Sequence, residues 1–313
     1  MSGILMVSVG NSYGSLPVNT VAPVVSGTAL TGQTLTTTNG TWIGAPAPTF
    51  TYQWQRGVSN ISGATSSTYA IQAADVGSTL RCVVTATNTL GAVSANSNNT
   101  AVVQMAIGTA FGGGFFAGII VQGGVQYRLI VAPKATGESG QQFKPSSDGY
   151  PAETITLNNG PAASASMNDP GYPAAHFCES LSIGGFTDWY LPSRDELEVC
   201  YRNLKPTTQT YSYSPRDKSA YTYPEGNDVV DDAMGVNRNS VPVGAEYTSG
   251  NPARTTVSNF QQGNSEAFFD VNYWSSSTFS STWVWTGRFE NGYQTRGNRL
   301  SANQVRAVRR VAV

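Results

Sequence analysis

The segment from Phe186 to Leu204 constrains the fold more than any other part of this sequence. It reads FTDWYLPSRDELEVCYRNL. Ser193 followed three positions later by Glu196 is a capping-box pattern, which marks a helix start. The next apolar residues recur at helical spacing and share one face: Leu197, Cys200, Tyr201 and Leu204. The pattern predicts a helix over residues 193–204, with Trp189 buried beside its start.

Other blocks of sequence flank this helix in a fixed order. They are Phe111-Gly112-Gly113-Gly114-Phe115, Leu129-Ile130-Val131-Ala132-Pro133, Tyr273-Trp274-Ser275-Ser276-Ser277 and Val305-Arg306-Ala307-Val308-Arg309. Together with the helix segment they resemble the C-terminal domain of Legionella collagen-like adhesins, a C-type-lectin-like domain that is also common in phage and prophage proteins. The resemblance covers about residues 106–313. It implies an α+β domain over 105–313 and says much less about the ligand.

Within that domain, we expect strands over 107–133 and a loop over 134–167. A first helix over 168–182 is expected to start at Asn168-Asp169-Pro170. Residues 205–270 are expected to be irregular, which in a compact domain often indicates function or an interface. The chain is expected to end in a strand meander over 273–277, 283–289, 293–296 and 305–311.

The N-terminal part of the chain is almost uncharged. Residues 1–127 contain only Arg56, Asp75 and Arg81, and charged residues make up 12% of the chain, against about 25% in typical soluble domains. Residues 21–104 alternate in short runs separated by turn residues, which predicts an all-β sandwich. The strand Thr49–Arg56 places Trp54 in its core, and Asp75–Asn88 carries Cys82.

These two strands resemble those of bacterial and phage immunoglobulin-like modules, in which an inward Trp lies beside a strand Cys. The fold class expected for the whole chain is therefore multidomain, an immunoglobulin-like β-sandwich over 21–104 followed by the C-type-lectin-like domain. A junction without a Pro/Gly linker at 100–110 indicates a semi-rigid connection.

The three cysteines lack obvious partners. The strand expected to face Cys82 reads Gln33–Thr38 and contains no cysteine. Relatives of the lectin-like domain bridge the position of Cys178 to the last strand, where this chain has Ala307. A Cys178–Cys200 bridge is an alternative, but buried free thiols are favoured. Cysteines without disulfide partners indicate a protein that folds in a reducing cytoplasm and is not exported.

The aromatic meander is the best candidate binding surface. Period-two alternation places Trp283, Trp285 and Gly287 on one face, and Asn291-Gly292 predicts a hairpin turn with Tyr293, Arg296 and Arg299 just beyond it. Aromatic rings and Arg or Asn side chains suit recognition of a glycan or protein. The candidate ligand-binding residues are Trp283, Arg288, Asn291, Tyr293, Gln294, Arg296, Asn298 and Arg299. The alternative is that the tryptophans, Trp274 and Trp285 above all, are core residues.

The sequence contains few features that would indicate a catalytic site or a metal site. His176 is the sole histidine, without a partner at metal or triad spacing. The acidic run 225–232 offers oxygen ligands for calcium but lacks EF-hand spacing, so a solvated loop is the favoured interpretation. Glu196 is explained by capping. We expect no enzyme activity, no cofactor and no bound metal.

The N-terminus is apolar through Ile4, Leu5, Met6 and Val7 but lacks the features of a signal peptide. It is either a first strand of the fold or an anchor in a larger assembly, with residues 1–20 as the docking segment. A net charge of −1 gives no basic footprint for nucleic acid, and no long apolar stretch predicts membrane insertion.

These features favour a phage virion protein, exposed on the particle and made in the host cytoplasm. A tail fibre or receptor-binding adhesin is expected to bind a host-surface glycan or protein, to contact other virion proteins through its N-terminus, and to form a homo-oligomer, most simply a trimer. A capsid or neck decoration protein with a structural role is the alternative, and a bacterial surface adhesin is the third.

Overall fold

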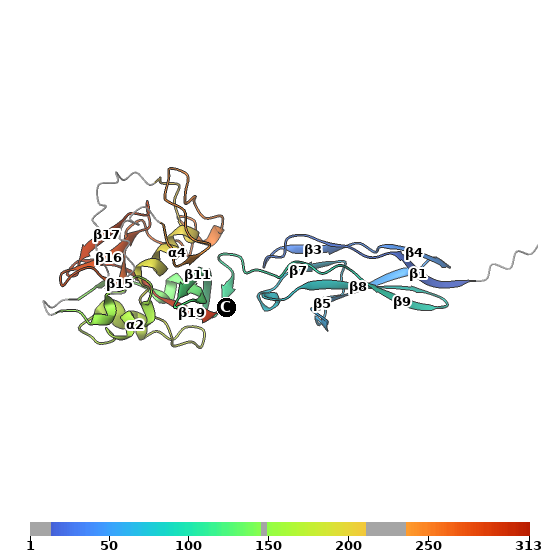
Figure 1. Cartoon of the computed structure of the whole chain (residues 1–313), viewed down its shortest axis with the longest axis horizontal. Coiled ribbons are helices and arrows are strands. Elements are labelled where there is room, and N and C mark those ends of the chain that lie inside the picture. The colour runs from blue at the N-terminus through green and yellow to red at the C-terminus, as the bar shows by residue number, and fades with distance from the viewer. Residues whose placement is uncertain (1–13, 145–148, 211–235) are drawn as a thin grey trace, which may run out of the picture. The chain divides into compact units, whose positions relative to one another are not determined.

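The computed structural model describes residues 14–144, 149–210 and 236–313. The chain divides after residue 106 into an N-terminal unit and a C-terminal unit, and strands dominate both (Figure 1). The expected boundary was residue 104. None of the helices among the described residues is long and apolar enough to span a membrane.

The described residues of the N-terminal unit form antiparallel strands in three small sheets. Strands β2 (Val25–Ser26), β3 (Thr34–Thr37) and β7 (Thr68–Ala70) form one sheet. Strands β6 (Ser59–Asn60), β5 (Thr49–Arg56), β8 (Leu80–Asn88) and β9 (Gly91–Asn96) form the second. Strands β1 (Ser15–Val21) and β4 (Thr41–Ala45) form a two-stranded ribbon.

Trp54 lies at the centre of the N-terminal core. It is fully buried, pairs directly with Cys82 across β5 and β8, and stacks on Tyr69. Its indole Nε1 donates to the carbonyl oxygen of Ser66 at 2.9 Å. Leu35, from the strand that carries no cysteine, also packs into this core. The sequence-based prediction of a sandwich centred on Trp54 and Cys82 therefore matches the packing.

Two of the three charged residues of this unit form a largely buried pair. Arg56 Nη2 lies 2.6 Å from Asp75 Oδ1, and Tyr69 donates its hydroxyl to Asp75 Oδ2. Burial, together with the neighbouring Asp75, raises the pKa of Tyr69 to about 12. The charge of the buried Asp75 carboxylate is thus balanced by Arg56, and its second oxygen is hydrogen-bonded by Tyr69.

The described residues of the C-terminal unit form two sheets. The first comprises β10 (Ala110–Phe111), β11 (Gly114–Gln122), β12 (Val125–Val131) and β19 (Val308–Ala312), with β14 (Ser240–Val241) paired to β11. The second runs in the order β13 (Glu138–Gln142), β18 (Ala302–Arg306), β15 (Asn272–Thr278), β16 (Trp283–Arg288) and β17 (Gln294–Asn298). The short helix α1 (Lys134–Gly137) connects β12 to β13.

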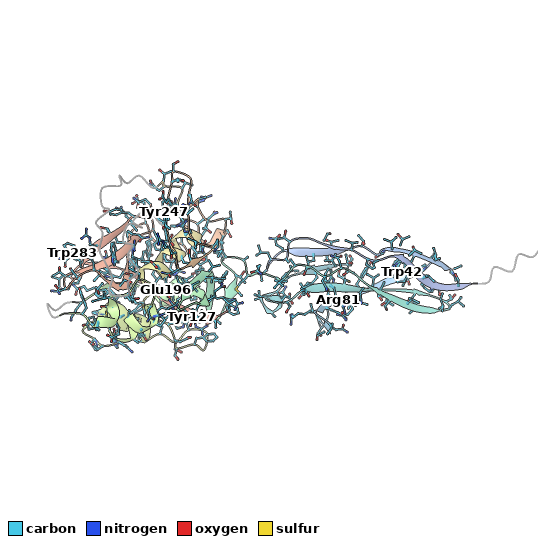
Figure 2. All side chains as sticks on the ribbon, viewed as in Figure 1. Trp42, Arg81, Tyr127, Glu196, Tyr247 and Trp283 are labelled. Carbon is cyan, nitrogen blue, oxygen red and sulfur yellow. The ribbon has the colours of Figure 1, made fainter. Side chains whose placement is uncertain are left out.

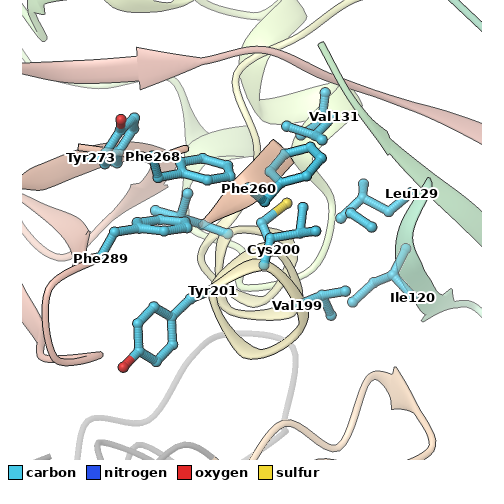
Figure 3. Packing of buried hydrophobic residues seen from close by; sticks show 14 of the residues in the cluster. Ile120, Leu129, Val131, Val199, Cys200, Tyr201, Phe260, Phe268, Tyr273 and Phe289 are labelled. Carbon is cyan, nitrogen blue, oxygen red and sulfur yellow. The ribbon is translucent and has the colours of Figure 1, made fainter. Parts of the chain in front are cut away.

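Helix α4 (Arg194–Leu204) begins where the sequence predicts, with both hydrogen bonds of the capping box formed between Ser193 and Glu196. Its apolar face packs into a core that includes Phe260, Phe268 and Phe289 (Figure 3). Phe268 and Phe289 stack with their ring centroids 3.9 Å apart. Trp189 is fully buried, as expected.

Two other expectations for this unit were wrong. The helix expected over 168–182 is only α3 (Pro173–Glu179), because Asp169 Oδ1 accepts from the Gly171 amide in a turn and Pro173 then starts the helix. An unexpected helix, α2 (Gly160–Ala165), lies in the segment expected to be loop.

The last strand is also divided. Ala307 separates β18 from β19, and its backbone bonds Gly137 and Ala132 instead of continuing one ladder. The strand expected over 305–311 therefore contributes to both sheets. The acidic run 225–232 and residues Ile4, Leu5, Met6 and Val7 lie outside the described residues.

Cys82, Cys178 and Cys200 are buried free thiols, so the Cys178–Cys200 bridge is not formed. Burial raises the pKa of all three, which suppresses the reactive thiolate. We expect a thiol reagent to find three thiols per chain in denaturant without reductant, and to react far more slowly with the native protein. One thiol in denaturant would contradict the structure.

Candidate functional site

The meander brings one set of predicted site residues onto a single sheet face. Residues directly opposite one another on paired strands share a face. Trp283 pairs with Asn298, Trp285 with Arg296, and Gly287 with Gln294. The predicted alternation of Trp283, Trp285 and Gly287 is confirmed by this register, which adds the three β17 residues to the same face.

Helix α4 covers this face at one end only. A side chain added at Gly287 would lie 3.2 Å from Leu197 of α4, so that end is closed. At the other end Trp283 remains 41% exposed. Figure 2 shows Trp283 at the periphery of the C-terminal unit, away from Glu196 and Tyr247. The accessible part of the sheet face is therefore the end that carries Trp283.

Two rings packed against each other, each with a guanidinium on it, hold this accessible end in place. The guanidinium of Arg296 lies 4.3 Å above the ring of Phe279, and Phe279 packs edge-on against Trp285 with the centroids 5.5 Å apart. On Trp285 lies the guanidinium of Arg194, at 4.6 Å, and its Nε donates to Gln294 Oε1 at 2.7 Å. Such cation–π contacts contribute about 0.5–2 kcal/mol each. They order Arg296 before any ligand binds.

We call this surface the Trp283 face and define it by its accessible members and their support: Trp283, Arg296, Asn298, Phe279 and Gln294. It combines an exposed indole, an ordered guanidinium and amide groups. These groups can stack on a flat apolar surface and hydrogen-bond hydroxyl or carbonyl groups beside it. Sequence analysis missed Phe279 and Arg194. No sequence signal identifies Arg194 as a site residue. It lies in the first turn of the helix, where the sequence pattern indicates only a helix cap.

The remaining predicted residues lie elsewhere. Arg288 is at the far end of β16, five residues from Trp283, a separation of about 17 Å along an extended strand. It pairs with Glu290. Asn291 uses its Oδ1 to accept from the backbone amide of Tyr293. The expectation that Tyr293, Arg296 and Arg299 lie together just beyond the turn was wrong, since strand β17 separates Tyr293 from Arg299.

The hairpin itself also differs from the prediction. Its strands close between Arg288 and Tyr293, which leaves a four-residue loop instead of a two-residue Asn291-Gly292 turn. Phe289, the first loop residue, is fully buried and pulls the loop toward the core. Gly292, with φ +80°, lies against Tyr201, where a Cβ would come within 2.4 Å of the ring.

Arg299 was wrongly expected to be exposed. Only 8% of it is accessible, and its Nη1 donates to the carbonyl oxygen of Ser281 at 2.7 Å. Its own carbonyl oxygen accepts from Phe143 and Lys144. Arg299 therefore holds the loops beside the sheet. Trp274 and Trp285 are buried, which confirms the alternative that they are core residues.

A groove of about 280 Å³ lies between β11, α4 and residues 240–251. Beside it, the buried carboxylate of Glu198 accepts from Tyr247 and Asn237, each at 2.8 Å, and pairs with Arg202. Burial raises the pKa of Glu198. These contacts fasten α4 to residues 237–247, so the Glu198 network has a structural role.

No group of three or more His, Cys, Asp or Glu side chains suited to a metal ion occurs in the described ranges. His176 Nδ1 lies 3.0 Å from Asn168 Oδ1, where it links α3 to the preceding turn.

The C-terminal unit can now be placed in a family. Residues 147–309, slightly more than half of the chain, match the family described as the Lcl C-terminal domain, and the chain belongs to that family.

A comparison of the chain with curated proteins found no match. Among solved structures, a fimbrial protein from Bacteroides ovatus is similar at a TM-score of 0.35 and 9% identity, over 92% of this chain and 70% of that chain. A score this low does not establish a shared fold.

Proposed function

We propose that this chain is a non-enzymatic attachment protein whose Trp283 face binds a glycan or protein on a host cell surface. The observation that carries the proposal is the exposed Trp283 beside Arg296, a guanidinium already ordered on Phe279. Exposed aromatic and arginine side chains on a rigid sheet are typical of recognition surfaces. Membership of the Lcl C-terminal domain family supports an adhesin-like role.

In the finer form of the proposal, the protein belongs to a phage virion, as a tail fibre or receptor-binding protein. The N-terminal unit is an immunoglobulin-like spacer and the C-terminal unit a C-type-lectin-like head. The segment containing Ile4, Leu5, Met6 and Val7 docks the protein onto other virion proteins. Presentation as a homotrimer would increase avidity for a weakly bound surface.

The alternative is a capsid or neck decoration protein, which the nearly uncharged N-terminal part of the chain also suits. A bacterial surface adhesin is a third possibility. Gold-labelled antibody against the chain would locate it on the tail, on the head, or on the bacterial surface. Each location selects one of the three functions.

The Trp283 face makes a specific prediction for binding. We expect Trp283→Ala and Arg296→Ala each to weaken adsorption to host cells by about 2 kcal/mol, roughly 30-fold. Both variants should remain folded and lose no more than about 1 kcal/mol of stability, including the contact of Arg296 with Phe279, since both side chains reach solvent. Adsorption of the purified full-length variants, with competition against intact particles, measures the effect.

The matched control is Val125→Ala, an exposed apolar residue on the other sheet of the same unit. It should leave adsorption unchanged. If both Trp283→Ala and Arg296→Ala adsorb like the unmodified protein while remaining folded, the Trp283 face is not the binding surface and the decoration function is favoured.

A further inference from the structure

The ribbon of β1 and β4 has an apolar outer surface. Val18 and Ile43 lie directly opposite each other across the two strands, and they are 51% and 60% exposed. Leu16 and Leu90 are also exposed large apolar residues. We call these four residues the ribbon patch.

Leu16 and Leu90 continue the patch around the start of β1. A side chain added at Gly14 would lie 2.8 Å from Leu90, and one added at Gly91 would lie 2.8 Å from Leu16. The inner side of the ribbon behaves differently, because Pro17 is buried and Trp42 packs toward Phe50 with the centroids 6.2 Å apart. The ribbon therefore has one side committed to its own unit and one apolar side facing out.

Neither strand of the ribbon carries a charge that would prevent pairing, and only β1 contains a proline, Pro17. Natural edge strands usually carry charges, above all Lys, or prolines that prevent association. Residues 1–55 contain no charged side chain. Among the described residues, β1 and β4 pair only with each other, so each is an edge strand. Single exposed apolar residues are ordinary, whereas an uncharged apolar ribbon with two edges favours association.

The chain also contains a segment that fits this ribbon. Ile4–Val9 reads ILMVSV, is uncharged, and would span about 20 Å when extended. Strand β4 has five residues and β1 has seven, so the lengths correspond. Gly10–Gly14 connects the segment to the start of β1. Every further copy brings both the segment and the ribbon, and neither carries a charge that would have to be desolvated.

We propose that the β1–β4 ribbon receives Ile4–Val9 of a second copy of this chain, added as a strand along one edge beside the ribbon patch. The contact is head-to-tail, since the donated segment and the receiving ribbon are different surfaces. Such contacts close into rings when the rotation allows, which is compatible with a trimer. The inference deepens the docking role proposed for the N-terminus by naming its partner as another copy.

Two variants test the two parts of this interface, the ribbon and the donated segment, independently. Val18→Lys combined with Ile43→Lys places charges on the ribbon and leaves the segment intact, whereas deletion of residues 1–13 removes the segment and leaves the ribbon intact. The control is Val58→Lys, which changes a 79% exposed residue in the β5–β6 turn. Light scattering on full-length protein after size-exclusion chromatography, over a concentration series, gives the oligomeric state.

We expect the unmodified protein and Val58→Lys to associate, and each interface variant to shift the association midpoint at least about tenfold, or 1.4 kcal/mol. An equimolar mixture of the two interface variants should form a complex of two chains, because one supplies the segment and the other the ribbon. A far-ultraviolet circular dichroism spectrum checks that the double-lysine variant is folded. Ile43→Lys alone is used if it is not.

The proposal is overturned if the unmodified protein stays monomeric at every concentration, as it would if its own segment covered the ribbon. It is also overturned if folded lysine variants associate normally, or if the mixture fails to form a complex. Oligomeric state requires no host ligand. Failure here therefore leaves the Trp283 face untouched, and failure of adsorption leaves the ribbon untouched.

Discussion

Replacing Glu196 with alanine is expected to lower the free energy of unfolding of the C-terminal unit by about 3–5 kcal/mol. The carboxylate is fully buried and accepts from the Ser193 backbone amide at 2.8 Å and from the Tyr190 hydroxyl. It also forms an ion pair with Arg310 of β19 at 2.5 Å. Alanine would leave the buried Arg310 cation without its partner, which is the costly way to break such a pair.

Denaturant unfolding of the full-length protein measures this effect. Glu290→Ala is the matched control, because Glu290 pairs with Arg288 nearer the surface and such pairs contribute only about 0–1 kcal/mol. A loss below about 1 kcal/mol for Glu196→Ala would show that α4 does not depend on Arg310. Glu196→Gln should fall between the two, since it keeps a hydrogen-bond acceptor and removes the charge.

Trp54→Ala is expected to destabilise the N-terminal unit by a similar amount, about 3–5 kcal/mol. The substitution removes the largest side chain of that core and the hydrogen bond to the carbonyl oxygen of Ser66. The two units have separate cores. Differential scanning calorimetry should therefore show a lower midpoint for one transition and an unchanged midpoint for the other.

Val58→Ala provides the comparison for Trp54→Ala, because Val58 is exposed in the same unit and its truncation should change stability by no more than about 0.5 kcal/mol. A joint shift of both transitions in Trp54→Ala would contradict separate cores. An unchanged N-terminal transition would contradict the central position of Trp54.

Local patterns predicted the local structure well. Helix α4 and its capping box follow from the spacing of Ser193, Glu196 and Leu197, because a helix start is satisfied by groups within four residues. The alternation along β16 follows from the geometry of a single strand. The inward position of Trp54 beside Cys82 follows in the same way from two paired strands.

The candidate site could be predicted only in part. Trp283 and its strand partners were found, because the aromatic, arginine and amide residues of the meander were enough to identify it as a candidate binding surface. Placing Arg296 and Arg299 at a single tip with Tyr293 failed, because the sequence does not reveal that strand β17 continues to Asn298 and carries these residues away from the turn. Nor does it reveal that Arg299 bonds the carbonyl oxygen of Ser281 in the loop beside the sheet.

The C-terminal arginines show most clearly what sequence and tertiary structure each determine. The sequence alone placed residues 305–311 in a strand next to the end of the chain. Only the tertiary structure shows that Arg306 pairs with Glu266 at 2.6 Å, that Arg309 pairs with Asp188 at 2.7 Å, and that Arg310 reaches Glu196. Helix caps and strand alternation are satisfied by neighbours in the chain, and so they can be predicted from spacing. A buried charge takes its partner from whichever residue the fold brings within hydrogen-bonding distance, and here the partners lie 40 to 121 positions away.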